Sequence, residues 1–296
     1  MDLAVLLKNR FLNAWSLFAL IVVPSSLVML WGMLRVDVWN GPNVSSMIQL
    51  SVRFAVPWLF LTFAASSLQV LFPGAISLWI ARNRKYLGLI FAAGMAWQGF
   101  FILWMVTVFS DYYVNEVYVL RDAIEGVIGY LFLIAMTITS FMPVRRHMKP
   151  QTWKLLHKSG IYFLWAYAFS TYWWSLYYYE GPVLLDYVFY WAALVACVLR
   201  IAAWTKKRLK KAQRVSADRQ TNSGLQVLGL GLVTGGLVMA ALVSVWFASA
   251  ESVLYGYSFT AWPEKYLPYW PFEPFLPLLL ILGGGWLIAK AKTPAS

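Results

Sequence analysis

Apolar residues along this chain gather into eight long runs separated by short polar segments. The runs cover roughly 11–34, 52–72, 86–109, 124–144, 155–178, 184–204, 225–249 and 275–290. As an α-helix, about 20 apolar residues span the roughly 30 Å hydrocarbon core of a bilayer. A helix also satisfies its own backbone hydrogen bonds, as lipid requires. The pattern therefore predicts an all-α polytopic membrane helix bundle with about eight transmembrane helices.

Basic and acidic residues indicate which side of the membrane each polar segment faces. With the N-terminus inside and the runs alternating, the inner segments and adjacent helix ends hold 20 of the 24 Lys and Arg residues. The exceptions are Arg35, Arg53, Arg121 and Lys265, and ten of the 12 acidic residues fall on the outer side. Short cytoplasmic segments of membrane proteins carry such an excess of basic residues. The charges therefore predict an N-in/C-in topology, with an even number of spans.

Composition supports a lipid environment and excludes several functional classes. The chain has 296 residues, of which 61% are hydrophobic and 12% charged, and its mean hydropathy is +0.64. Soluble domains carry roughly 25% charged residues. The net charge of +12 lies in the inner segments, so it indicates topology and not nucleic-acid binding. Cys197 is the single cysteine, and the sequence has no metal-spaced cluster, catalytic arrangement or nucleotide-binding motif.

The polar segments between the runs divide the chain and suggest where partners bind. Segment 205–224 is a basic cytoplasmic loop between a bundle over 50–204 and two further helices over 225–296, while 1–49 holds the first helix and its outer loop. The basic half of this loop is either a topology anchor that touches anionic lipid or a docking site for an acidic protein partner. Its residues are Lys206, Lys207, Arg208, Lys210 and Lys211. Segment 251–274 is rich in Trp, Tyr, Phe and Pro, so it lies in the outer interface or binds a partner.

Three segments of the predicted bundle carry a more specific pattern. They read RKYLGL at 84–89, MTITSF at 136–141 and WKLLHK at 153–158. Over about residues 50–180 the chain resembles the ferric reductase-like transmembrane family, which includes the heme subunit of bacterial protein-methionine-sulfoxide reductase. The resemblance implies a cytochrome b-like bundle in a bacterial inner membrane, where histidines on the third and fifth helices bind heme iron for electron transfer.

Two positions that match the family's heme ligands are substituted. His157 matches the inner histidine of the fifth helix. Ser170, 13 residues later, and Gln98 on the third helix stand where the family has histidine. Neither serine nor glutamine is a usual heme ligand. Compared with the family pattern, the outer heme site has therefore lost both of its partners.

His157 and Gln98 each allow two interpretations. His157 is either an axial ligand of one surviving heme b or a polar residue at the membrane edge, bonded to a neighbour. Methionines that could supply a second ligand are Met95, Met136 and Met142. A buried amide in a membrane is costly unless it is bonded, so Gln98 either bridges to Ser170 or Thr171 across the former heme space or faces another subunit. Bulky residues that could fill that space are Trp97, Trp165, Trp173 and Trp174.

These observations lead to three hypotheses about function. The first is an accessory or scaffold subunit of a membrane complex, which keeps the redox-family bundle without a cofactor and binds lipid and a protein partner. The second is a heme-dependent electron-transfer subunit fed by a quinone or a flavoprotein. The third, a small-molecule transporter, rests on helix number alone. Gly231 and Gly235 form a GxxxG pair that predicts a close helix contact, within the chain or with another chain.

Overall fold

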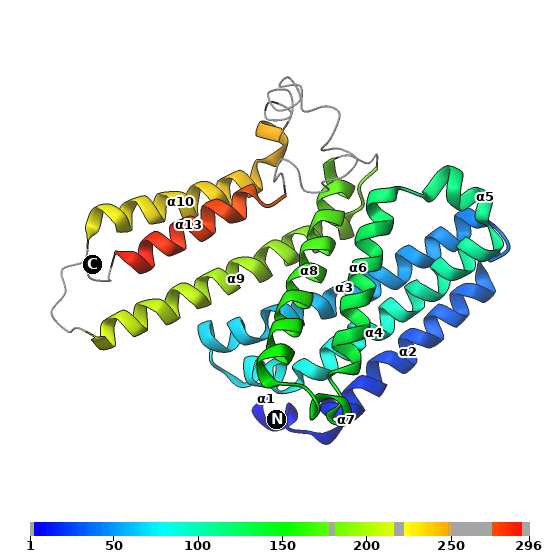
Figure 1. Ribbon diagram of the computed structural model, residues 1–296, viewed down its shortest axis with the longest axis horizontal. Helices are drawn as coiled ribbons and strands as arrows, with labels where there is room; N and C mark the ends of the chain where they lie inside the picture. Colours follow the sequence, from blue (N-terminus) through cyan, green and yellow to red (C-terminus); the bar gives the residue numbers. More distant parts are fainter. Residues whose placement is uncertain (1–2, 178–180, 216–221, 248, 250–273, 292–296) are drawn as a thin grey trace. The chain divides into compact units, whose positions relative to one another are not determined.

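The computed structural model describes residues 3–177, 181–215, 222–247, 249 and 274–291, and 88% of them are helical. No strand occurs among these residues, which confirms the all-α fold class. The named elements, shown in Figure 1, are α1 (Leu3–Leu6), η1 (Arg10–Leu12), α2 (Ala14–Arg35), α3 (Gly41–Leu71), α4 (Ala75–Val108), α5 (Ser110–Tyr112), η2 (Tyr113–Val117), α6 (Leu120–Ile138), α7 (Met142–Arg145), α8 (Pro150–Tyr177), α9 (Leu184–Val215), α10 (Ser223–Ala241) and α13 (Leu276–Lys290).

Each of the eight apolar runs has a helix over most of its length. Among the described residues, five helices are long and apolar enough to cross a membrane: α2, α3, α4, α9 over Leu184–Ala212, and α10. The first two turns of α6 carry Arg121, Asp122 and Glu125, and α13 has only 15 residues. By length and composition, five described helices could therefore cross a membrane, and α6, α8 and α13 do not meet these criteria.

Several helices extend well beyond their apolar runs. α3 begins at Gly41 and α4 at Ala75, roughly three turns before the predicted spans. Segment 205–224, expected to be a loop, is helical as far as Val215, where α9 ends. Lys, Arg, Gln and Ala are good helix formers, so a helix can continue past the point where its apolar run stops. Hydropathy marks the part of a helix that suits lipid and not the end of the helix.

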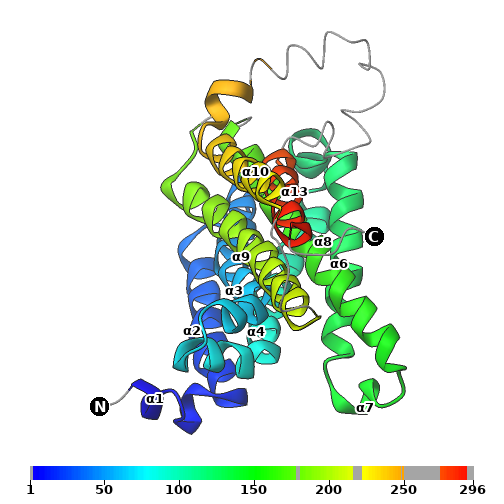
Figure 2. The same ribbon diagram turned by 90° about the vertical axis from the view of Figure 1, so that its left-hand side faces the viewer.

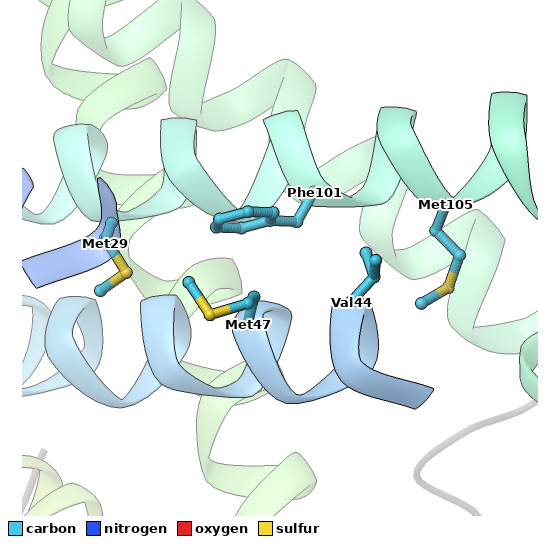
Figure 3. Packing of buried hydrophobic residues seen from close by; sticks show 5 residues of the cluster. All are labelled: Met29, Val44, Met47, Phe101 and Met105. Atoms are coloured by element: carbon cyan, nitrogen blue, oxygen red, sulfur yellow. The ribbon is translucent and has the colours of Figure 1, made fainter. Parts of the chain in front are cut away.

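The chain forms two compact units, and each is described by itself. The first unit comprises Met1–Ala65 and Gly74–Ala168, and the second comprises Ser66–Pro73 and Phe169–Ser296. The first contains α2, most of α3, α4, α6, α7 and the first part of α8. One buried cluster joins α2, α3 and α4 in this unit, as Figure 3 shows, and its members are Met29, Val44, Met47, Phe101 and Met105. Flexible methionine side chains suit such irregular gaps between helices.

A polar latch fixes the segment before α2 onto the start of α4. Asn83 is only 1% exposed, and its Oδ1 accepts a hydrogen bond from the Ala14 amide at 2.9 Å. Its Nδ2 donates to Asn13 Oδ1 at 3.0 Å and to the Trp79 carbonyl at 3.1 Å. Trp79 Nε1 donates to the Leu12 carbonyl at 2.7 Å. Ala14 has a φ of 59°, a left-handed conformation that is strained for alanine, so the latch holds a costly turn in place.

In the second unit, α10 and α13 lie side by side, as Figures 1 and 2 show. Glycines form their contact. A Cβ added to Gly229 would lie 2.8 Å from the Gly284 carbonyl oxygen, and one added to Gly236 would lie 2.6 Å from the Pro277 carbonyl oxygen. Nothing lies within 4 Å of a Cβ added to Gly231 or Gly235. The contact within the chain therefore uses Gly229 and Gly236, and not the GxxxG pair.

Candidate functional site

His157 lies near the start of α8, and one ring nitrogen is bonded to a neighbouring hydroxyl. Nε2 is 3.0 Å from Thr139 Oγ1. The Thr139 hydroxyl donates to the Ala135 carbonyl at 2.7 Å, so its oxygen accepts the His157 N–H. A ligating histidine presents an unprotonated nitrogen to its metal. In this tautomer Nε2 carries a proton that it donates to Thr139, so it offers no lone pair to a metal ion.

Trp153, one turn earlier on α8, covers the His157 ring. The two ring centroids are 4.3 Å apart, and Trp153 Nε1 donates to the Thr139 carbonyl at 3.0 Å. The Arg145 guanidinium lies 4.2 Å from the centre of the Trp153 ring. Thr139 thus receives both a ring N–H and an indole N–H from α8. His157 therefore has a hydrogen-bonding neighbour in Thr139 and a ring neighbour in Trp153.

Gln98, in the middle of α4, has its bond with α6. The Tyr130 hydroxyl is 2.9 Å from Gln98 Oε1 and 3.1 Å from the Met95 carbonyl oxygen. Within the first unit, the hydrogen-bond partner of Gln98 is therefore Tyr130, which the sequence analysis did not consider. Tyr130 could have been noticed, since its hydroxyl stands inside an apolar run and must find a partner there. Ser170 is buried in the part of α8 that belongs to the second unit.

Of the methionines considered as second iron ligands, Met136 has a side chain in close packing. A Cβ added to Gly160 would collide with the Met136 sulfur and lie 3.1 Å from Phe132 Cδ1. Met136 thus packs α6 directly against α8 at Gly160, which lies about one turn after His157. Met95 contributes its backbone carbonyl to Tyr130, and the Met142 side chain is exposed.

Aromatic side chains fill the interior of the first unit between α3 and α8. Trp165 is buried and stacks on the fully buried Phe63 ring, with centroids 5.1 Å apart. The Tyr162 ring meets Phe63 edge-on at 5.2 Å. Trp97, in contrast, donates from Nε1 to Ser26 Oγ at 3.0 Å and therefore faces α2. Of these two tryptophans, Trp165 is the one that packs between α3 and α8.

The residues at the family's ligand positions do not fit a heme. Gln98 offers a carboxamide whose oxygen already accepts from Tyr130, and Ser170 offers a hydroxyl, neither of which is a usual ligand for heme iron. His157 Nε2 lies 3.0 Å from Thr139 Oγ1 and is engaged in that hydrogen bond. Among the described residues, no group of three or more His, Cys, Asp or Glu side chains could hold a metal ion. Hydrogen bonds of Gln98, His157 and Trp153 join α4 and α8 to α6 and its C-terminal end.

The basic segment on α9 contains one lysine with a structural role. Lys206 Nζ donates to the Val70 carbonyl at 3.0 Å and to the Leu71 carbonyl at 3.4 Å. It therefore caps the C-terminus of α3, where carbonyls have no helical partner and a cation is favoured. The other members of the segment are exposed: Lys207, Arg208, Lys210 and Lys211. The aromatic segment predicted over 251–274 lies outside the described residues except for its last position.

Family models, curated proteins and solved structures compared with this chain give no match.

Tyr130→Phe is expected to lower the free energy of unfolding by about 1 kcal/mol, because Gln98 Oε1 loses its donor inside the bundle. Thermal unfolding of the detergent-purified protein measures the change. Tyr118→Phe is the matched control, since this exposed hydroxyl has no hydrogen bond to the described residues, and it should change stability by less than about 0.5 kcal/mol. Equal midpoints for the two variants would show that the Gln98–Tyr130 bond contributes nothing.

Proposed function

We propose that this chain is an accessory or scaffold subunit of a membrane complex, built on a ferric reductase-like bundle whose heme ligands have been replaced by hydrogen-bonding residues. One observation carries the proposal: the polar groups at two of the family's ligand positions are bonded to α6. His157 Nε2 bonds to Thr139, and Gln98 Oε1 accepts from Tyr130. Such bonds favour a bundle held together by its own side chains over one organised around a cofactor.

The proposed protein spans a bacterial inner membrane eight times with both termini in the cytoplasm. The distribution of basic residues supports this orientation. Two surfaces are then available to a protein partner. The exposed Lys207, Arg208, Lys210 and Lys211 of α9 would face the cytoplasm, where they suit an acidic surface. The open face of α10 with Gly231 and Gly235 would lie in the membrane, where small residues let another helix approach closely.

The visible spectrum of the purified protein distinguishes this proposal from a heme-dependent electron-transfer subunit. We expect no Soret band, no change with dithionite, and no band after hemin is added to well-folded protein. A band that sharpens on reduction and disappears in His157→Ala would instead assign His157 to iron and overturn the proposal. A matched control is His147→Ala, which removes the other histidine and should leave any such band intact.

Solubilisation of native membranes in a mild detergent tests the scaffold role itself. The chain should migrate in native electrophoresis as part of an assembly larger than its own 33.8 kDa plus detergent. Charge reversal at Lys207, Arg208, Lys210 and Lys211 should release it if the partner binds through these residues. A chain that migrates alone in the mildest detergents would count against an accessory subunit, whatever its spectrum.

A further inference from the structure

One end of the first unit carries a dense set of cations. They come from the segment before α2, the start of α4, α7 and the start of α8, and they are Lys8, Arg10, Arg82, Arg84, Lys85, Arg145, Arg146, Lys149, Lys154 and Lys158. The acidic residues described in this unit are Asp37, Asp111, Glu116, Asp122 and Glu125, which lie near the opposite helix ends. Among the described residues of the unit, this end is therefore strongly positive and carries no acidic side chain, and in the proposed topology it faces the cytoplasmic leaflet.

Lys85 is the cation most enclosed by aromatic rings. Its Nζ lies 5.1 Å from the Phe141 ring centre, 5.7 Å from that of Tyr86 and 5.9 Å from that of Trp15. Trp15 also stacks on Phe141 with centroids 6.2 Å apart, which joins the start of α2 to the turn after α6. The polar latch fixes the chain at Ala14, next to Trp15. The ammonium is thus held above a preformed aromatic shelf.

Arg145 follows Phe141 closely in the chain and lies over another aromatic ring. Its backbone amide donates to the Phe141 carbonyl at 2.9 Å, so it lies one turn after the ring that contacts Lys85. Its guanidinium covers Trp153 at 4.2 Å. Both Lys85 and Arg145 are exposed and lie over aromatic rings, and neither side chain has a hydrogen bond or an ion pair with another described residue. The three ammonium and five guanidinium N–H donors therefore have no acceptor oxygen in the described part of the chain.

Exposed apolar residues form a stripe along α6 that ends near Phe141 and Arg145 in the chain. On α6 they recur at helical spacing as Val127, Leu131, Ile134 and Ile138, and the stripe ends at the turn that carries Phe141 and the exposed Met142. A stripe of this kind along a bilayer-facing helix suits acyl chains. Trp and Tyr rings beside it suit the headgroup level, where one part of the ring is dry and another wet.

We propose that Lys85, over the rings of Trp15 and Phe141, and Arg145, over the ring of Trp153, together bind the phosphate of an anionic phospholipid in the cytoplasmic leaflet. The phosphodiester supplies the acceptor oxygens and the negative charge that both cations lack, and the acyl chains follow the stripe on α6. Basic pockets between transmembrane helices on the cytoplasmic side are known to bind such headgroups. The inference needs the membrane orientation but not the scaffold role, and it holds whether or not the bundle carries a heme.

Native mass spectrometry of the full chain tests the site. The protein is exchanged into an equimolar mixture of dioleoylphosphatidylglycerol and dioleoylphosphatidylcholine, and the retained lipids are counted. Wild-type protein should retain the anionic lipid preferentially. Lys85→Gln with Arg145→Gln should weaken this binding by roughly 25-fold, at about fivefold for each cation removed. Lys154→Gln with Lys158→Gln removes the same charge from the same end of the unit and should change binding by less than about twofold.

Three outcomes would overturn the proposal. An equal loss of anionic-lipid binding in the two double variants would mean that the cations attract the lipid through their summed charge and that Lys85 and Arg145 form no specific site. Unchanged retention in Lys85→Gln with Arg145→Gln would mean that these residues do not bind the headgroup. Stabilisation against heat by inorganic phosphate, equal to that by dioleoylphosphatidylglycerol, would mean a site for free anions. If the double glutamine variant does not fold, the single variants should each lose about fivefold, and Lys85→Arg with Arg145→Lys should retain the preference.

Discussion

Gly284→Ala is expected to lower the free energy of unfolding by about 3 kcal/mol, although it adds a single methyl group. A Cβ at this position would lie 2.5 Å from the Gly229 carbonyl oxygen, 2.8 Å from Val233 Cγ2 and 2.9 Å from the Val233 amide nitrogen. Two of these three neighbours are backbone atoms of α10, which cannot rotate away as a flexible side chain could. The helices must therefore separate, and the loss of close packing accounts for the expected cost.

Gly235→Ala is the matched control, because nothing lies within 4 Å of its added Cβ. Alanine is the better helix former by about 1 kcal/mol, so this variant should be unchanged or slightly more stable. Unfolding by heat or by increasing sodium dodecyl sulfate in mixed micelles, followed by circular dichroism, compares the two. The free energy of unfolding should fall in Gly284→Ala and stay the same or rise in Gly235→Ala. A stabilised Gly284→Ala protein would mean that α10 and α13 are not in contact through their glycines.

Asn83→Ala is expected to cost about 2–3 kcal/mol and to release residues 7–14 from the start of α4. The substitution removes the acceptor of the Ala14 amide and the donor to Asn13 Oδ1 and the Trp79 carbonyl in a site that is only 1% exposed. A buried donor left without a partner costs about 1–3 kcal/mol. The strained Ala14 backbone, with its φ of 59°, then has less to hold it.

Hydrogen exchange followed by mass spectrometry locates this effect. Peptides covering residues 7–14 should lose protection in Asn83→Ala, while peptides from α9 keep theirs. Asn43→Ala removes a comparable amide bond, from Asn43 Nδ2 to the Asp37 carbonyl at 3.1 Å, but at an exposed position. It should cost less than about 0.5 kcal/mol. Wild-type protection of residues 7–14 in Asn83→Ala would show that the latch does not hold the segment.

The helical character of the fold could be predicted because long apolar runs leave few alternatives. Each run has a helix over most of its length, including the runs in α6, α8 and α13, which are too polar or too short to be identified as membrane-crossing. Helix ends were harder to predict. The basic residues after Trp204 belong to α9 as far as Val215, since hydropathy responds to the lipid and not to the propensity of Lys and Arg for helix.

The candidate site shows where sequence spacing becomes insufficient. His157, Gln98 and Ser170 could be singled out as positions, but their partners depend on how each helix is rotated about its axis. In helices that are apolar on all sides, the sequence does not mark the inward face. Tyr130 as the partner of Gln98 was missed for this reason. The same ambiguity affected α10, where Gly229 and Gly236, seven residues apart, form the contact although Gly231 and Gly235 have the recognised spacing.

The latch also constrains the order of events during synthesis. Ala14 and Asn83 are 69 positions apart, so the ribosome has completed α2 and α3 before the acceptor for the Ala14 amide exists. At about 5–20 residues per second, the interval is on the order of 3–14 s. In the proposed orientation, charge alone keeps the start of α2 on the cytoplasmic side during that time, through Lys8 and Arg10. In that orientation, two tasks are separated in time: basic residues orient the first span as it inserts, and Asn83 fixes the start of α2 seconds later.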